Sequence, residues 1–418
     1  MRFNTKEMYL ILFRLLKRVS KIDIHSLQVA YISKIVGREL GFSRQRLNVL
    51  GFLHDIGLLN PVQVNQVQRT LGVENASISN WLALNSGLQE NHAVIGARIV
   101  SHIEDISELS DVVEKHHYYP ILLNPEIDHD IMASVVHLAD SVSIQLLSGE
   151  KDFNHMETIK RAVVNSNEFL EKAKFAFEKI SEKKGFWWTV VDENTLYDEF
   201  ERDLEENPLS NSDLQSLGDI LMYMTDVKSR FTTFHTERIA YVSKLLAERA
   251  HLGEERAMEV FFAAKIHDLG KMATPISILE KPGKLTKEET FIMQRHIFDS
   301  YLIVGGREAI EKHRLLQWGV NHHERLDSSG YAWGKSSTEL DLESRIIMIA
   351  DVFVALTEDR PYRKGMSIGA SLDVVARQVQ SGLLDEYVFT KLRDLVAEGL
   401  DFTRIESNTR RTLFFYET

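Results

Sequence analysis

Cysteine is absent from this chain of 418 residues, and proline occurs only 7 times. Without cysteine there are no disulfides, no thiolate catalysis and no cysteine-bound zinc, which fits a reducing compartment such as the cytoplasm. A metal site in this chain must therefore use histidine and carboxylate ligands. The scarcity of proline favours helices over a loop-rich architecture.

Excess positive charge and long apolar runs are missing as well. The formal net charge of -12 argues against binding of long nucleic acids, which requires a clustered basic surface. The apolar run MYLILF at residues 8–13 is broken by Arg14, and it is far shorter than the roughly 20 residues that cross a bilayer. We therefore expect a core-facing helix here, no signal peptide, no membrane partner and a cytoplasmic location.

Helical periodicity of apolar residues runs through most of the chain. Stretches such as LQVAYISKIVGREL and RIAYVSKLLAERA show it, and strand-like alternation is scarce, so we predict an all-α fold. Thr286 and Glu289 have the spacing of a helix capping box. For the aromatic segment FWWTVVDEN, residues 186–194, we expect a short strand or a packed aromatic turn.

An internal repeat of about 210 residues organises the chain, because ten of its 16 histidines fall into two series of matching order and context. The first series is His25, His54, Asp55, His92, His116, His117 and Asp140, and the second is His235, His267, Asp268, His296, His322, His323 and Asp351. We predict two tandem helical bundles, at residues 1–150 and 216–418, joined by a mostly helical connector at 151–215.

Histidine and aspartate in this order are typical of a metal centre. Asp351 lies in the otherwise apolar stretch RIIMIADVFVALT, and a buried carboxylate needs a cationic partner or a metal. Neighbouring residues on a helix point about 100° apart. We therefore expect the pair His267–Asp268 to bind two neighbouring ions, with the aspartate bridging them. Nitrogen and oxygen donors suit Fe, Mn, Co, Ni or Zn.

A binuclear centre of this kind points to phosphoester hydrolysis. Two ions lower the pKa of a bridging water from about 15.7 towards roughly 7, and they stabilise both the attacking and the leaving oxygen. Lys271, one turn after Asp268, can offset the charge that develops on phosphate oxygens. Taken alone, a lysine at this position is more often a surface charge at a helix end.

The second half, from about residue 225 to 400, resembles an HD-GYP domain of the HD phosphohydrolase superfamily. The resemblance is carried by HDLGKMATPISILEKPGKLTKEE, MQRH, NHHERLDSSGYAWG and SRIIMIADVFVALTEDRPYR. It implies a bacterial signalling enzyme that hydrolyses a cyclic dinucleotide, c-di-GMP or 3′3′-cGAMP, to a linear 5′-phosphorylated dinucleotide. It also implies two divalent metal ions, with Fe or Mn favoured and Ni, Co or Zn compatible.

The resemblance assigns roles to individual residues. The whole second series would bind the metals, with Asp268 bridging the ions and Lys271 contacting the scissile phosphate. Residues expected to bind substrate are Lys271, Arg325, Gly330, Tyr331, Arg360 and Arg363. The loop that contains Gly330 and Tyr331, which we call the Gly-Tyr loop, is also a candidate contact for a signalling partner. A homodimer is a candidate assembly.

This half departs from the family pattern at several positions. Ser328 and Ala332 stand where the loop usually has glycine and proline. Val354 replaces a carboxylate that could read a guanine edge, and Phe231 replaces a glutamate ligand of trinuclear members, so we expect two metals. The departures leave a second interpretation open, in which the domain is a non-catalytic cyclic-dinucleotide receptor or scaffold.

The first half resembles the same superfamily, and its series offers a second metal site with all seven ligand types in order. Leu58 stands where the second half has Lys271, and the KPGKLT turn and the Gly-Tyr loop have no counterpart. We therefore expect little or no cyclic-dinucleotide hydrolysis in this half. We favour a degenerate domain with a structural or regulatory role over a metal-loaded sensor or an HD nucleotide phosphohydrolase of other specificity.

Overall fold

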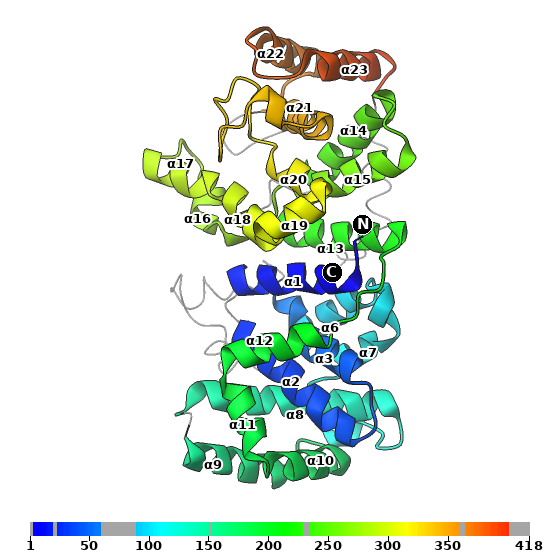
Figure 1. The fold of residues 1–418 in the computed structure, drawn as a ribbon, viewed down its shortest axis with the longest axis vertical. Helices are drawn as coiled ribbons and strands as arrows, with labels where there is room; N and C mark the ends of the chain where they lie inside the picture. The colour runs from blue at the N-terminus through cyan, green and yellow to red at the C-terminus, as the bar shows by residue number, and fades with distance from the viewer. Residues whose placement is uncertain are drawn as a thin grey trace. The chain divides into compact units, whose positions relative to one another are not determined.

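The computed structural model describes residues 3–19, 23–59, 89–150, 152–228, 235–358 and 364–400. Within these ranges the chain forms α-helices and short 3-10 helices, two isolated β-bridges and no β-strand. The all-α prediction is therefore confirmed. The helices divide into two compact units, Arg2–Leu209 and Ser210–Thr418, whose elements are labelled in Figure 1.

The N-terminal unit begins with the predicted core-facing helix, which buries Leu12, Leu15 and Leu16 completely. Its elements are α1 (Thr5–Val19), α2 (Asp23–Glu39), α3 (Arg44–Leu53), η1 (Ile56–Leu59), α6 (Gln89–Val100), η3 (Glu104–Leu109), α7 (Ser110–Glu114), η4 (Pro120–Leu122), α8 (Asp128–Ser148), α9 (Phe153–Val164), α10 (Glu171–Ser181), α11 (Lys184–Val191) and α12 (Glu193–Arg202).

The C-terminal unit contains the predicted capping box, in which the side chains of Thr286 and Glu289 each bond the other residue's backbone N–H. Its elements are α13 (Asn211–Val227), α14 (His235–Arg249), α15 (Glu254–Lys265), η5 (Leu269–Ala273), α16 (Ile276–Leu279), α17 (Lys287–Gln294), α18 (His296–Ile303), α19 (Gly306–Lys312), α20 (Arg314–Val320), η6 (Ser337–Glu339), α21 (Leu342–Thr357), α22 (Ile368–Gln380) and α23 (Glu386–Ala397).

The sequence repeat is also a structural repeat. In the N-terminal unit α2 packs against α3 and α8, and in the C-terminal unit α14 packs against α15 and α21. Each trio carries a histidine near the start of its first helix, the His-Asp pair after its second and an aspartate in its third. This three-helix packing brings residues that are far apart in sequence to one buried place in each unit.

The residues expected to form a connector, 151–215, contribute α9 to α12 of the N-terminal unit and the start of α13. Buried polar contacts tie these helices to α2. The Nζ atom of Lys34 donates to Oδ2 of Asp203 at 2.8 Å, and Nε2 of Gln28 donates to the carbonyl oxygen of Val190 at 2.9 Å. Helices α11 and α12 are therefore integral to the core of this unit.

The aromatic segment at residues 186–194 is helical, so the expected strand or turn was wrong. It forms most of α11, and Asp192 caps the following helix α12 by accepting from the backbone N–H of Thr195. The rings of Phe186 and Trp187 pack edge-on against Phe177 of α10. Aromatic packing between helices, rather than the β-propensity of the segment, decides its local structure.

Among the described residues one helix, α8, is long and apolar enough to cross a membrane, with a mean hydropathy of 1.4 over the best window. In the structure 67% of that window is buried inside the unit. Because α8 carries Asp140 and packs on α2, its apolar character is that of a core helix.

Candidate metal centres and active site

The predicted metal ligands of the C-terminal unit lie mostly at helix ends. His235 and His296 begin α14 and α18, and Asp351 lies within α21. The pairs His267–Asp268 and His322–His323 lie in the turns directly after α15 and α20. The expectation that His267 and Asp268 diverge by a helical angle was therefore wrong, because the helix ends at Lys265.

Their position after helix ends fixes how the imidazole rings are oriented. The last carbonyl groups of a helix have no partner within the helix. In His267, His296 and His322, Nδ1 lies 2.6–2.7 Å from the carbonyl oxygen of the residue three positions earlier. Because a carbonyl oxygen only accepts, Nδ1 carries the proton in each ring and Nε2 presents a lone pair.

Asp268 lies among these lone pairs. Its Oδ2 atom is 3.1 Å from Nε2 of His267, and its Oδ1 atom is 3.3 Å from Nε2 of His296 and 3.6 Å from Nε2 of His322. The two groups of side chains that could each hold an ion are His235, His267 and Asp268, and His296, His322 and His323. The two oxygens of Asp268 face different groups, as expected for a bridging carboxylate.

The donor set fits divalent cations. Nε2 of His267, Nε2 of His296 and Oδ1 of Asp268 are buried without a hydrogen-bond partner among the described residues. Burial lowers the pKa of His296 to about 4, so its ring is neutral. Lone pairs crowded in this way repel one another unless a cation lies between them, and neutral imidazole with carboxylate suits a transition metal.

Burial and neighbouring charges set the pKa values of Asp268 and His267. Burial alone would raise the pKa of Asp268, but His267 and Lys271 hold it well below its ordinary value. Burial also opposes protonation of His267, but Asp268 outweighs it, so the pKa of His267 is raised. Neighbouring positive charge therefore favours the ionised form of Asp268 although it is buried.

Sequence reasoning missed Glu358, which lies behind His235. The Nδ1 atom of His235 is 2.6 Å from Oε2 of Glu358, and Nη1 of Arg238 donates to Oε1 at 2.9 Å. On its other side, Nε2 of His235 faces Oδ1 of Asp351 at 4.0 Å. Glu358 follows Asp351 by seven residues, two helical turns, and that spacing was a signal that could have revealed it. The carboxylate orients the imidazole, as is common behind metal-binding histidines.

Lys271 contacts the carboxylate of Asp268. Its Nζ atom lies 2.5 Å from Oδ2 of Asp268, and its side chain is 17% exposed against 3% for the aspartate. The lysine side chain is thus the more exposed partner of this contact. Gly270 permits η5 to pack closely on α18, because a Cβ atom there would lie 1.9 Å from the carbonyl oxygen of His296.

The Gly-Tyr loop is held by Glu324, a second residue that sequence reasoning missed. Glu324 is completely buried, and its two carboxylate oxygens accept from the backbone N–H groups of Trp333 and Lys335, both at 2.9 Å. The ring of Tyr331 packs on His323, with centroids 4.8 Å apart. The loop therefore reaches the metal-ligand cluster through Tyr331.

Two other residues predicted to bind substrate make structural contacts within this loop. Nη1 of Arg325 donates to the carbonyl oxygens of Glu324 and His322, at 2.6 and 3.3 Å. A Cβ atom on Gly330 would lie 2.4 Å from Cα of Glu324, so glycine is required for this approach. Ser328, where the family has glycine, has a φ of 67°, a left-handed conformation that costs a non-glycine residue energy.

Of four further positions named from the sequence, only Val354 lies within the described residues. Arg360 and Arg363, predicted to bind substrate, lie outside the described residues, and so does Phe231. Val354 is described and is completely buried in α21. Its side chain is therefore part of the core.

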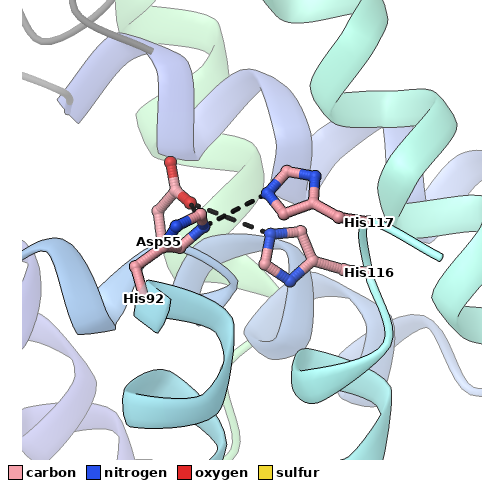
Figure 2. A group of neighbouring side chains, drawn as sticks. All are labelled: Asp55, His92, His116 and His117. Carbon is pink, nitrogen blue, oxygen red and sulfur yellow. Dashed lines mark hydrogen bonds and ion pairs between the residues drawn. The ribbon is translucent and has the colours of Figure 1, made fainter. Parts of the chain in front are cut away.

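The N-terminal unit gathers its own series around Asp55, as Figure 2 shows for four of the residues. Oδ1 of Asp55 is 3.1 Å from Nε2 of His92, and Oδ2 is 3.4 Å from Nε2 of His54. The two groups that could each hold an ion are Asp55, His92, His116 and His117, and His25, His54 and Asp55. Asp140 completes the set, with Oδ1 3.3 Å from Nε2 of His25.

Hydrogen bonds also fix two imidazoles in this unit. Nδ1 of His54 lies 2.8 Å from a carbonyl oxygen at the end of α3. Nδ1 of His25 lies 2.9 Å from Oγ of Ser143, whose hydroxyl donates to Oε1 of Gln28 at 2.6 Å. The two Nε2 atoms lie 3.3 Å apart, where a protonated ring can donate to its neutral neighbour. Together with Asp55 and Asp140 these imidazoles form a nitrogen and oxygen donor set that fits a metal as well.

The two centres differ in the charge beside Asp268 and Asp55. Leu58, at the position of Lys271, is 3% exposed and brings no charge. Burial opposes protonation of His54, but Asp55 and Asp140 outweigh it and raise its pKa to about 9. Negative charge from Asp55 and Asp140 therefore dominates at His54, and among the described residues the ion-pair partners of Asp55 are histidines alone.

Comparison with known proteins identifies both units. Two family models, each described as HD domain, match residues 22–145 and 219–388. The chain therefore contains two HD-type domains, one in each unit.

Relatives named as cyclic-dinucleotide phosphodiesterases are similar to this chain. The 3′3′-cGAMP-specific phosphodiesterase 1 of Vibrio cholerae is 29% identical over 409 residues, which cover 92% of this chain and 90% of the relative. The cyclic di-GMP phosphodiesterase response regulator RpfG of Xanthomonas campestris is 41% identical over 145 residues, 34% of this chain and 37% of the relative. The second match therefore concerns only part of each protein.

A solved structure supports the tandem architecture. The crystal structure of a cyclic GMP-AMP specific phosphodiesterase of V. cholerae, V-cGAP3, aligns with a TM-score of 0.59 over 96% of this chain and 99% of that one. Its sequence identity is 19%, so this likeness concerns the fold alone.

Proposed function

We propose that the C-terminal unit is a metal-dependent phosphodiesterase that opens a cyclic dinucleotide, c-di-GMP or 3′3′-cGAMP, to a linear dinucleotide with a 5′-phosphate. The observation that carries the proposal is the contact of a partly exposed lysine, Lys271, with Asp268 in a buried set of metal donors. The similarity to the V. cholerae phosphodiesterase 1, which spans most of both chains, supports the substrate class.

Metal ions in this centre, with Fe or Mn our expectation, would supply Lewis acidity and an activated water for attack on phosphorus. The protein's own groups have separate tasks. Asp268 stays ionised and holds the two groups of histidines together. Glu358 keeps His235 in one orientation. The ammonium group of Lys271 offsets the negative charge that grows on the phosphate oxygens.

For the N-terminal unit we propose a metal-binding domain with a structural or regulatory role rather than a second cyclic-dinucleotide hydrolase. Its donor atoms are arranged like those of the C-terminal unit. Leu58 leaves it without the ammonium group that a doubly esterified phosphate would meet at Lys271. We keep the cytoplasm as the proposed location, since the chain has no cysteine and its long apolar helix is largely buried.

The test begins with metal analysis of the purified full chain. The protein, loaded with Mn²⁺ or with Fe²⁺ without oxygen, is then incubated with c-di-GMP, 3′3′-cGAMP and the linear dinucleotide pGpG, and the products are separated by chromatography. We expect a linear 5′-phosphorylated product from at least one cyclic substrate. Tight binding of the cyclic substrates without any product would instead support the receptor interpretation.

A further inference from the structure

Three aromatic side chains lie together on the surface of the C-terminal unit. Phe298 and Tyr301 lie three residues apart on α18 and stack, with ring centroids 6.0 Å apart. Trp333 of the Gly-Tyr loop meets Tyr301 edge-on, at 5.3 Å between centroids. We call Phe298, Tyr301 and Trp333 the aromatic platform.

The platform is exposed although its rings are large and apolar. Phe298 is 42% exposed and Trp333 is 43% exposed, and Tyr301 is half-buried between them. Exposed aromatic side chains that contact one another are costly in water and mark a surface that binds a partner or ligand. A cation accompanies them, because Nζ of Lys335 lies 5.5 Å from the centroid of the Trp333 ring.

The helix and the loop that carry the platform also carry or contact residues of the candidate metal centre. Helix α18, which carries Phe298 and Tyr301, begins with His296. Trp333 lies two residues after Tyr331, whose ring packs on His323. The backbone N–H of Trp333 is also fixed by the buried carboxylate of Glu324. The platform is therefore held by the same helix and loop that position two of the metal ligands.

We propose that the aromatic platform stacks one purine base of the substrate while the scissile phosphate lies at Lys271. This inference rests on the proposed function. Every base has a π-face, and stacking on aromatic side chains contributes to binding without reading hydrogen-bond edges. A cyclic dinucleotide carries a base on either side of each phosphate, so a base platform on the helix and loop that also carry or contact His296 and His323 matches its shape. The platform binds the base and leaves the chemistry at phosphorus to the metal centre.

The test compares substrates with and without a purine. Trp333→Ala and Phe298→Ala are assayed on c-di-GMP, on 3′3′-cGAMP and on bis(p-nitrophenyl) phosphate, a phosphodiester that lacks a base. We expect the ratio of kcat/KM for the cyclic dinucleotide to kcat/KM for bis(p-nitrophenyl) phosphate to fall about fivefold or more. The loss should appear mainly in KM, and Trp333→Phe should restore much of it.

Phe291→Ala provides the matched control, because Phe291 lies on α17, is 74% exposed and is not part of the platform. Its ratio should equal that of the wild type. An unchanged ratio in both Trp333→Ala and Phe298→Ala, with active wild type, would overturn the platform while leaving the proposed function intact.

Calorimetric titration of c-di-GMP into the metal-free full chain separates the two proposals further. If the wild type binds c-di-GMP but its metal-loaded form hydrolyses no cyclic dinucleotide, a higher Kd in Trp333→Ala supports the platform while the proposed function fails. Equal Kd values in wild type and variant would overturn the platform, and a wild type that neither binds nor hydrolyses would overturn both.

Discussion

The Nζ atom of Lys271 lies 2.5 Å from Oδ2 of Asp268. The corresponding neighbours in the N-terminal unit are Leu58 and Asp55, and Leu58 brings an apolar, nearly buried side chain to this position. The two HD domains therefore share the arrangement of metal donors but differ in the group that would neutralise a substrate phosphate. This difference determines which unit we expect to hydrolyse a phosphodiester.

Replacing Lys271 with alanine should lower kcat/KM for the cyclic dinucleotide by about 100-fold, since one charge-stabilising donor at the reacting phosphate is removed. Metal content should be unchanged, because the side chain is not a metal donor. Steady-state kinetics and metal analysis of the same preparation measure both quantities. The control is Lys287→Ala on α17, where the side chain is exposed; equal rates in the two variants would refute the role of Lys271.

Glu358→Gln should weaken metal binding in the C-terminal centre by about 10- to 100-fold, because the carboxylate that orients His235 loses its charge. Titration of Mn²⁺ into the metal-free protein measures this affinity. Glu398→Gln, which alters an exposed ion pair with Arg249, should leave it unchanged. A Glu358→Gln protein that binds metal as tightly as the wild type would show that the contact is only structural.

Removal of the metals should destabilise the folded protein, since a ligand that binds only the folded chain stabilises it and each unit holds buried groups of donors such as His25, His54 and Asp55. At a free metal concentration about 100-fold above Kd, binding contributes about 2.7 kcal/mol, which for a unit of this size corresponds to a Tm shift of about 5–10 °C. Thermal denaturation with chelator and after reconstitution measures the shift. If Asp55→Asn and the wild type gain the same Tm from metal, the N-terminal centre does not bind it.

Ser328→Gly should stabilise the C-terminal unit by up to about 1 kcal/mol. The φ of 67° at Ser328 is strained for serine, and the relief exceeds the extra chain entropy that glycine brings to the unfolded state. Ser329→Gly should be destabilising instead, because Oγ of Ser329 donates to Asp327 and its φ is not positive. Chemical denaturation of both variants tests the contrast, and a loss of stability in Ser328→Gly would contradict it.

Much of the architecture could be predicted from the sequence because its signals are local or repeated. Apolar spacing gave the all-α class, and the Thr286–Glu289 spacing gave a capping box that the structure contains. The two ordered series pointed to residues that the fold does bring together around Asp55 and Asp268.

The remaining features depend on packing between distant segments. The aromatic segment of α11 was misread because its partners, such as Phe177, are set by tertiary structure. The His267–Asp268 pair was placed on a helix because periodicity does not show where the last helical turn ends. Glu324 and Glu358 were missed because their partners, loop N–H groups and one imidazole, are recognisable only in the folded chain.

The most direct test of the account compares Asp268→Asn with Asp55→Asn in the full chain, measuring hydrolysis of c-di-GMP and 3′3′-cGAMP together with bound metal per chain. We predict that each variant loses metal from its own centre. Asp268→Asn should abolish hydrolysis, and Asp55→Asn should retain an active C-terminal site. Hydrolysis that survives Asp268→Asn and disappears in Asp55→Asn would contradict the assignment of the chemistry to the C-terminal unit.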